Sequence, residues 1–261
     1  MEDGIRLLLA YKSYAVLAWF AIFFAAERLA SAARPHGGWR WDWGRLSRNG
    51  GLWLINVAAS VLIVLPLTAW AEVRSLDWRP SWWQGAAGLA LDLILLDFLI
   101  YWWHRANHRV PFLWRFHEVH HRDRFLDTTS AVRFHFGEVL LSAAARALAI
   151  VALSIPFASV LAFETLVLLA ALFHHSNLKI PSPLERALAR IVITPSIHWV
   201  HHHARQLDTD SNYGTILSIW DPLFRSRNRR TARTPDMEIG VEREGELDFG
   251  GLLLQPFRAR R

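Results

Sequence analysis

The sequence predicts an all-α, polytopic membrane protein with about four to five transmembrane or re-entrant helices and a cytoplasmic, histidine-rich helical cap. Two observations on composition support this fold class. Hydrophobic residues make up 52% of the 261 residues, and tryptophan and phenylalanine number 14 and 15. This is more apolar than an average soluble domain. The third observation is that several apolar stretches are long enough to cross a bilayer.

The first three predicted spans follow one another in the N-terminal part of the chain. The first covers residues 7–29, where Lys12 near one end can extend to the membrane interface. No small-residue cleavage site follows it convincingly, so we interpret it as a retained helix, with a signal peptide as the alternative. The second span, residues 52–73, contains Pro66, which membrane helices tolerate. The third covers residues 85–103.

The apolar stretch at residues 139–173 is too long for one span. Pro156 near its middle predicts a break and therefore a helical hairpin, and the sequence leaves open whether this hairpin crosses the bilayer fully. Arginines cluster in residues 34–48, in residues 105–133 and after residue 184. If all three segments face the cytoplasm, the positive-inside rule gives one consistent topology, with the histidine clusters on the cytoplasmic side.

The absence of cysteine limits the chemistry. It excludes structural disulfides, thiolate zinc sites, cysteine-ligated iron–sulfur clusters and a CxxCH haem attachment, so nitrogen and oxygen must hold any bound metal. The net charge of +6 comes from arginine, since Lys12 and Lys179 are the only lysines. On a membrane protein this charge indicates topology rather than nucleic-acid binding. The preference for arginine points to a GC-rich bacterial genome, and we expect the bacterial inner membrane.

Ten of the 13 histidines lie in clusters between residues 97 and 221. Three clusters have the i,i+4 or i,i+3,i+4 spacing that stacks imidazoles on one face of a helix. Their members are His104 and His108, then His117, His120 and His121, then His198, His201 and His202. Eight imidazoles exceed what one ion uses, so the count points to a two-metal centre. His174 and His175 form a further, adjacent pair.

The residues around these clusters favour iron over zinc. The segment HEVHH at residues 117–121 is one residue too short for the HExxH helix of a zinc protease. Few carboxylates stand near the histidines, whereas a hydrolytic two-zinc centre would use bridging carboxylates. A nitrogen-rich, thiolate-free pair of metals at a membrane surface suits iron and oxygen chemistry. A two-zinc membrane hydrolase and a non-enzymatic membrane metal-binding or transport protein are the alternatives, and transport is disfavoured because the histidines gather on one side.

Asp97 lies in an otherwise apolar predicted span, where an ionisable side chain is a candidate functional group. Steps of four, three and four residues lead from Asp97 through Tyr101 and His104 to His108, which places all four on one helix face. We therefore expect Asp97 to accept a proton from the far nitrogen of a ligand histidine and to orient that ring. A helix-packing hydrogen bond is the alternative.

Ordered motifs in residues 92–225 resemble those of the fatty acid hydroxylase and sterol desaturase superfamily of membrane di-iron enzymes. The first two are DFLIYWWHRANH at residues 97–108 and LWRFHEVHH at residues 113–121. The others are RFHFGE at 133–138, HSN at 175–177, HWVHH at 198–202, NYG at 212–214 and WDPLF at 220–224. Either HxxHH motif alone would be a weak signal, but the ordered set is highly specific.

The resemblance implies a set of site residues. The eight histidines of the three helical clusters would be iron ligands, and His175 and His135 would be the ninth and tenth. No catalytic residue is expected beyond the metal ligands. Phe136 stands where the family often has proline, which is a departure from the family pattern next to His135. His174 and His203 are extra neighbours without a ligand role. The residues placed beside the ligands are Asp97, Tyr101, Asn177, Tyr213 and Asp221.

We expect one structural domain with three regions. Residues 1–84 would hold N-terminal transmembrane helices and loops, residues 85–230 the fatty acid hydroxylase-type catalytic region, and residues 231–261 a charged C-terminal tail. Tyr101, Trp102 and Trp103 are candidate walls of a slot for an acyl or sterol chain, with interfacial anchoring as the alternative.

The activity implied by the resemblance is insertion of oxygen from O2 into an unactivated C–H bond of a lipid by two iron ions (Fe2+/Fe3+). Desaturation at the same site is the alternative. The chain has no GxGxxG and no haem motif, so a separate ferredoxin or cytochrome with its reductase is expected to supply electrons. The arginines of residues 225–230 are candidates for docking an acidic carrier, with ordinary positive-inside charge as the alternative. The sequence does not fix which lipid or carbon is oxidised, nor the oligomeric state.

Overall fold

The computed structural model describes residues 2–34, 42–229 and 231–258, and these residues form helices without a β-strand. The predicted all-α fold is therefore confirmed. The longer helices are α1 (Glu2–Leu29), α2 (Trp43–Ala59), α3 (Leu65–Val73), α4 (Gly85–Arg109), α5 (Pro111–His121), α6 (Phe136–Leu153) and α7 (Phe157–His175). The shorter ones are α8 (Ser182–Leu188), α9 (Pro195–His201), α10 (Gln206–Thr209), α11 (Trp220–Leu223) and α12 (Phe249–Leu254). A π-helical segment η1 (Ser60–Val64) joins α2 to α3, and η2 (Thr128–Val132) and η3 (Gln255–Phe257) are short 3-10 turns.

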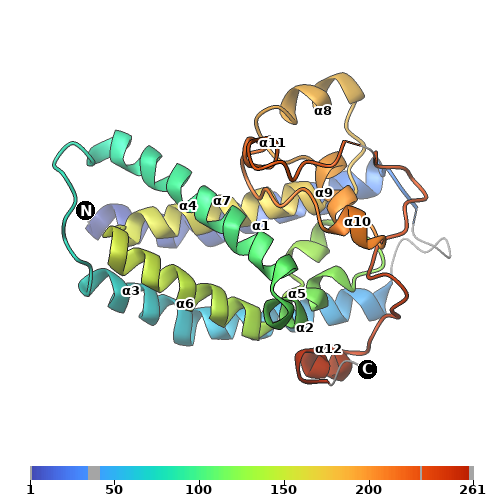
Figure 1. Ribbon diagram of the computed structural model, residues 1–261, viewed down its shortest axis with the longest axis horizontal. Coiled ribbons are helices and arrows are strands. Elements are labelled where there is room, and N and C mark those ends of the chain that lie inside the picture. The colour runs from blue at the N-terminus through green and yellow to red at the C-terminus, as the bar shows by residue number, and fades with distance from the viewer. Residues whose placement is uncertain (1, 35–41, 230, 259–261) are drawn as a thin grey trace.

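Four helical segments of the described residues are long and apolar enough to cross a membrane. They are Trp43–Val73, Gly85–Arg109, Phe136–Leu153 and Phe157–His175. Helix α1 covers the first predicted span and packs against α7, although the four segments do not include it. Figure 1 shows the long helices running along the bundle, with the short helices α8 to α11 at one end. These helices indicate an integral membrane protein.

The second predicted span is one continuous helix that widens before its proline. Pro66 has no backbone N–H to donate, and the helix widens into the π-helical segment η1 just before it. The Leu65 N–H accordingly bonds to the Ser60 carbonyl, five residues back. Val61, Leu62 and Ile63 on this segment are exposed, as expected for side chains that face lipid.

The predicted break at Pro156 is confirmed. Helix α6 ends at Leu153, Ser154 takes a left-handed conformation with φ of 52°, and Pro156 is the residue before α7. Helix α6 packs against α2 and α3, whereas α7 packs against α1 and α4. Both helices of the hairpin line one cavity, to which Val139 of α6 and Val167 of α7 contribute.

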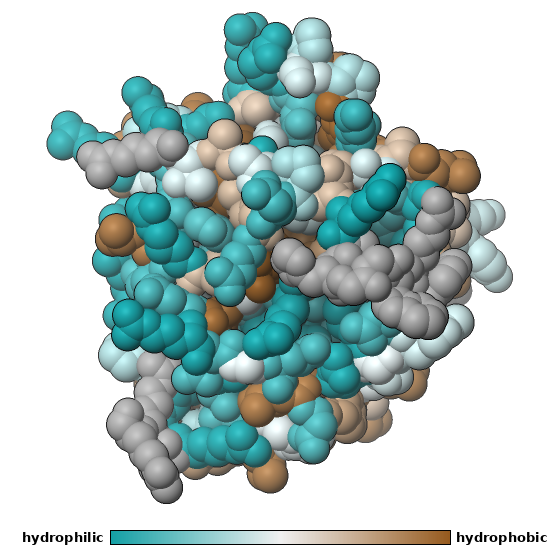
Figure 2. All heavy atoms as spheres, turned by 90° about the vertical axis from the view of Figure 1, so that its right-hand side faces the viewer, coloured by the Kyte–Doolittle hydropathy of each residue, from teal (hydrophilic) through white to brown (hydrophobic). Residues whose placement is uncertain are grey.

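A polar cap closes the end of the bundle at which α4 and α7 terminate. Figure 2 views the molecule from this end and shows a predominantly hydrophilic face. Beneath the surface, the Arg45 guanidinium donates to the Asp123 and Asp127 carboxylates and to the Phe125 carbonyl, which holds the loop after α5 against α2. Part of the predicted basic connection, residues 35–41, lies outside the described residues.

Candidate metal centre

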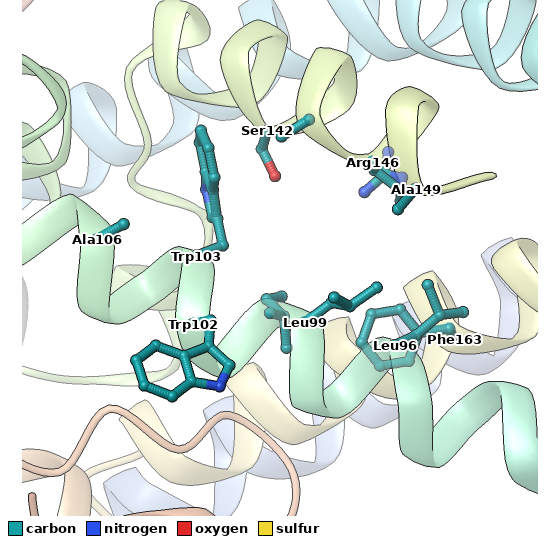
Figure 3. Close-up of a pocket in the computed structure, with 11 residues that line it drawn as sticks. Leu96, Leu99, Trp102, Trp103, Ala106, Ser142, Arg146, Ala149 and Phe163 are labelled. Atoms are coloured by element: carbon teal, nitrogen blue, oxygen red, sulfur yellow. The ribbon is translucent and has the colours of Figure 1, made fainter. Parts of the chain in front are cut away.

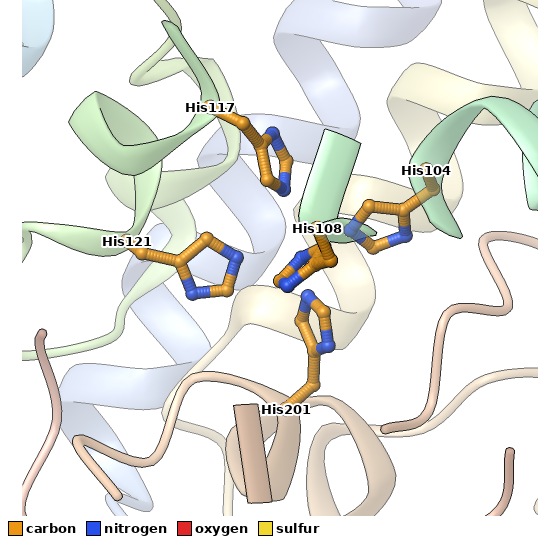
Figure 4. Close-up of side chains that lie close together, drawn as sticks. All are labelled: His104, His108, His117, His121 and His201. Carbon is orange, nitrogen blue, oxygen red and sulfur yellow. The ribbon is translucent and has the colours of Figure 1, made fainter. Parts of the chain in front are cut away.

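Nine histidines from four helices converge at the capped end of the bundle. Their nitrogen atoms form two groups, and within each group the atoms lie within 4.8 Å of one another. The first group comprises His104, His108, His117, His121 and His201, and the second comprises His120, His175, His198 and His202. Figure 4 shows the rings of the first group turned toward a common point from α4, α5 and α9. Each group can hold one metal ion.

Histidines that are adjacent in the sequence belong to different groups. His120 and His121 are adjacent on α5, and His201 and His202 are adjacent at the end of α9, yet each pair is divided between the groups. Adjacent residues on an α-helix point about 100° apart, because 3.6 residues complete a turn. The HxxHH motif therefore gives its last two imidazoles to two different centres.

The nitrogen positions fit metal ions. His175 Nε2 lies 3.1 Å from His120 Nε2 and 3.0 Å from His198 Nε2. Nitrogens about 2.0–2.1 Å from one shared ion lie about 3 Å from each other when adjacent. In the first group, Nε2 of His117 and of His201 is buried without a hydrogen-bond partner among the described residues. Buried polar atoms of this kind call for a ligand.

Hydrogen bonds to the far nitrogen fix several rings. The Nδ1 atom of His104 lies 2.8 Å from the Tyr213 carbonyl, and that of His201 lies 2.7 Å from the Ser211 carbonyl. In the second group, His120 Nδ1 approaches the Arg133 carbonyl at 3.1 Å. A carbonyl can only accept, so each Nδ1 carries the proton and each Nε2 presents its lone pair to the centre.

Glu138 is a site residue that was missing from the predicted set. Its carboxylate lies 2.8 Å from Nδ1 of His117 and also accepts from the Asn107 amide. The third element of the family motif set, RFHFGE at residues 133–138, contains this glutamate, so the signal was present in the sequence. Glu138 stands on the first turn of α6, one turn after His135 in the same motif.

Replacing Glu138 with alanine is expected to weaken metal binding about 10- to 100-fold, because His117 loses the acceptor that fixes its ring and tautomer. Competition with a chelator measures the loss. Glu138→Gln is the matched control, since its amide oxygen still accepts from His117 Nδ1 and should preserve most of the affinity. Equal affinities for the alanine variant and the unchanged protein would contradict this role.

Burial keeps the ligand set neutral. Desolvation, followed by the neighbouring imidazoles, lowers the pKa of each of five histidines of the cap well below the usual 6.5. They are His120, His121, His198, His201 and His202. Neutral imidazole is the form that binds metal.

The metal-free protein is expected to lose stability as the pH falls below about 6.5. Because the folded-state pKa values are depressed, the unfolded chain takes up protons first, so stability is complete above the unfolded value and declines toward the folded one. Thermal unfolding between about pH 8 and about pH 5 measures this dependence. A His121→Gln variant should show a shallower slope, and a pH-independent unfolding temperature would refute the assignment.

His135 does not join either group. Its Nδ1 accepts from the Gly137 N–H at 2.9 Å, and its Nε2 lies 3.1 Å from the Leu253 carbonyl. With both ring nitrogens engaged by the protein, His135 caps the N-terminus of α6. The structure thus places His135 outside both groups, although the resemblance implied that it is a metal ligand.

Asp97 also differs from its expected role. Its carboxylate accepts from the backbone N–H groups of Ile216 and Leu217 and from the Trp220 indole, at 3.2, 3.1 and 2.8 Å. None of these three hydrogen bonds joins Asp97 to a histidine of either group. Asp97 instead anchors the 216–220 segment to α4. This is a packing hydrogen bond, the alternative that the sequence left open for Asp97.

Asp221 supports the backbone of Tyr213, which in turn supports the first group. The Asp221 carboxylate accepts from the Tyr213 N–H at 2.8 Å, and the Tyr213 carbonyl faces His104 Nδ1. The Tyr213 ring packs against His108 and His201, and burial raises the pKa of its phenol to about 12. Tyr213 therefore lies beside the first group, and Asp221 holds its backbone.

Tyr101 and Asn177 lie farther from the metal groups. The Tyr101 hydroxyl is 2.7 Å from the Ser226 hydroxyl, and its ring stacks on Phe224. The Asn177 side chain accepts from the Ala33 N–H and donates to the Ala33 carbonyl, which ties the end of α1 to the segment after α7. These two side chains stabilise the cap rather than touch a ligand.

The two extra histidines occupy different surroundings. His203 Nδ1 lies 2.8 Å from the Asp208 carboxylate, away from both groups, as its spare status predicts. His174 is 2% exposed, with its ring centroid 4.0 Å from that of His198, so it is a buried neighbour of the second group rather than an interfacial residue.

An apolar cavity of about 560 Å³ opens onto the histidines. Both groups contribute to its wall, and so do Leu161, Val167 and Ala171 of α7. A second pocket of about 300 Å³ lies between α4 and α6, where Trp102 and Trp103 line it (Figure 3). Trp102 and Trp103 therefore line this pocket, whereas Tyr101 is fully buried and is not among its lining residues.

The sequence profile described as "Fatty acid hydroxylase" matches residues 89–226, which is more than half of the chain. The chain belongs to the fatty acid hydroxylase family. The match covers all nine histidines of the two groups. No solved structure gives a significant match to this family member.

The curated relatives of this fatty acid hydroxylase family member include enzymes named as a lipid hydroxylase and as monooxygenases. An ornithine lipid hydroxylase from Rhizobium tropici is 30% identical over 179 residues, covering 68% of this chain and 53% of the relative. An alkylglycerol monooxygenase from Xenopus tropicalis is 30% identical, and the match covers 71% of this chain and 42% of the relative. The Danio rerio enzyme of the same name is 32% identical, and the match covers 69% of this chain and 38% of the relative. The chain spans about half the length of these relatives or less.

Proposed function

We propose that this protein is a membrane di-iron oxygenase that inserts one oxygen atom of O2 into an unactivated C–H bond of a lipid. One arrangement carries the proposal: two adjacent all-histidine groups share the end of an apolar cavity between spanning helices. All-nitrogen, thiolate-free pairs of sites suit iron and dioxygen. When bound, iron would supply reductive activation of dioxygen at this end of the cavity.

The side chains of the protein would act around that chemistry. Each histidine group holds one ion through neutral imidazoles, with Glu138 and the Tyr213 carbonyl keeping the Nδ1 protons of His117 and His104 in place. Leu161, Val167 and Ala171 hold the lipid chain against the histidines and exclude water. The protein thus positions a C–H bond beside the metals and keeps the oxidant dry.

Hydroxylation is the outcome we propose, rather than desaturation. The named relatives are a lipid hydroxylase and monooxygenases, and this similarity extends over 68–71% of the chain. Both names describe insertion of oxygen. The lipid class and the carbon oxidised are specific to each relative and do not transfer to this chain.

We place the histidine end on the cytoplasmic side of a bacterial inner membrane, with electrons supplied by a separate ferredoxin or cytochrome and its reductase. Arg225, Arg227 and Arg229 surround a polar surface pocket that also contains Asp221, whose carboxylate supports the backbone beside His104. Residue 230, also part of the predicted docking segment, lies outside the described residues.

An acidic electron carrier is the partner that this pocket fits, because the charges are complementary. Arg225→Glu with Arg227→Glu is expected to slow turnover with an acidic carrier at low salt and to leave turnover with a small artificial reductant unchanged. Equal losses with both reductants would contradict docking at this pocket.

Incubation of the purified, iron-loaded protein with a membrane lipid extract, a reductant and isotopically labelled dioxygen tests the proposed function. We expect one labelled oxygen atom in a lipid product, and elemental analysis should find about two irons per chain. His203→Ala is the matched control for a histidine variant, since His203 lies outside both groups. Stoichiometric zinc that iron does not replace, or a label that comes only from water, would overturn the proposal.

A further inference from the structure

Three charged side chains lie inside the apolar cavity, away from the histidines. Lys12 of α1, Arg146 of α6 and Glu164 of α7 all line the cavity that reaches the metal groups. Glu164 pairs with Lys12 at 3.4 Å and with Arg146 at 2.8 Å. Each side chain keeps 19–23% of its surface accessible, so the ion pairs do not bury it fully.

The charged cluster and the histidines stand at two ends of one slot. Glu164 and His174 are on the same helix, ten residues apart, which corresponds to about 15 Å of helix. The wall of α7 between them is apolar and includes Val167, Leu168 and Ala171. The cavity is therefore polar at each end and apolar in between.

The charges of the cluster do not balance. Two cations face one carboxylate, and Nε of Arg146 is buried without a hydrogen-bond partner among the described residues. Excess cationic donors inside a membrane span are costly unless an acceptor joins them. A ligand with an oxyanion would supply that acceptor and neutralise the remaining positive charge.

We propose that Lys12 and Arg146 bind the oxyanion, a carboxylate or phosphate, of an amphiphilic substrate whose hydrocarbon chain extends to the histidines. This inference rests on the proposed oxygenase function and specifies its substrate class. The oxidised carbon then lies on the order of 15 Å, or roughly ten to twelve carbons, from the charged end. A lipid with a cationic end would be disfavoured by the same two side chains.

The pocket between α4 and α6 gives such a substrate a route from the bilayer. This pocket shares Ile100, Arg146 and Phe163 with the cavity. Figure 3 shows Arg146 of α6 opposite Phe163 and the leucines of α4. Arg146 thus stands at the junction of the two spaces, where it meets an entering oxyanion before the chain reaches the metals.

Binding to the purified full-length protein without reductant tests the proposal, so that no turnover is needed. The ligands are dodecanoate, dodecyl phosphate and the uncharged dodecanol, and the proteins are the unchanged chain, Arg146→Met, Glu164→Gln and the exposed-site control Arg186→Met. We expect the anionic ligands to bind about tenfold more tightly than dodecanol, since hydrogen bonds to charged groups stabilise by that order. The better anion identifies the source of the oxyanion.

The two cluster variants should act in opposite directions. Arg146→Met should remove the preference for anions, whereas Glu164→Gln should increase it, because the competing carboxylate is gone. Ion pairs that only hold the helices together predict lower thermal stability in both variants and no change in preference, and that result would overturn the proposal. Equal affinity of the unchanged protein for dodecanol and dodecanoate would overturn it as well.

Failure of this inference is distinguishable from failure of the oxygenase assignment. Anion binding without lipid oxidation would leave the charged site standing and remove the proposed function. Oxidation of lipids without anion preference would do the reverse. In active protein, a hydroxyl placed next to the charged group of the lipid would also contradict the orientation proposed here.

Discussion

Alanine in place of His121 or His202 is expected to lower lipid oxidation by more than about a hundredfold, beyond the loss caused by removing a supporting hydrogen bond. His121 belongs to the five-histidine group and His202 to the four-histidine group, so in the proposed di-iron enzyme each substitution removes a ligand from a different ion. Reductive activation needs both ions in this assignment. Single-turnover assays on the two variants measure the effect.

Metal content separates the two variants from a folding defect. Each should retain about one iron per chain instead of about two, because the other group is intact. His203→Ala provides the control beside His202 and should keep both irons. Loss of both irons in each variant would mean that the two groups fill only together, and unchanged metal content would exclude the histidine assignment.

Replacing Arg45 with methionine is expected to destabilise the protein by about 3–5 kcal/mol. The substitution leaves the Asp123 and Asp127 carboxylates buried without their shared cation. Burial alone would raise the pKa of Asp123, but Arg45 and Arg133 outweigh it and hold this pKa below 3.8. The Arg45 guanidinium therefore helps to keep the Asp123 carboxylate charged.

The partly exposed pair of Arg48 with Glu246 supplies the control for Arg45. Arg48→Met should cost only about 0–1 kcal/mol, as accessible ion pairs do. Unfolding in detergent, followed by loss of helical signal, measures both variants. Equal effects of the two substitutions would show that burial of the Arg45 network contributes nothing special to stability.

The sequence predicted the helices and the ligand helices well because these depend on local pattern. The break at Pro156 follows from a missing backbone donor, and the spacing of His117, His120 and His121 follows from the helical repeat. Long apolar runs gave the spanning helices for the same reason. These features need no knowledge of which elements touch.

The division of the ligands and the roles of Asp97 and His135 could not be predicted in this way. Asp97 shares a helix face with His104, but the approach of the 216–220 segment gives it closer donors. The imidazole of His135 is of a type that binds metals. Its two nitrogens, however, are engaged by the Gly137 N–H at the start of α6 and by the Leu253 carbonyl. Such partners come from distant parts of the chain, which helical spacing does not encode.

The division of neighbouring histidines between the two groups has a mechanical consequence. One peptide unit on α5 and one at the end of α9 connect the two centres, and each is part of a hydrogen-bonded helix. The backbones of α5 and of the end of α9 therefore limit how far the two groups can move apart. Insertion of a single residue after Val119 would turn His120 and His121 by about 100°, so that His120 would take the direction of the present His121 and His121 would turn away from the first group. In the proposed di-iron enzyme, the distance between the two groups should consequently change little when a substrate fills the cavity.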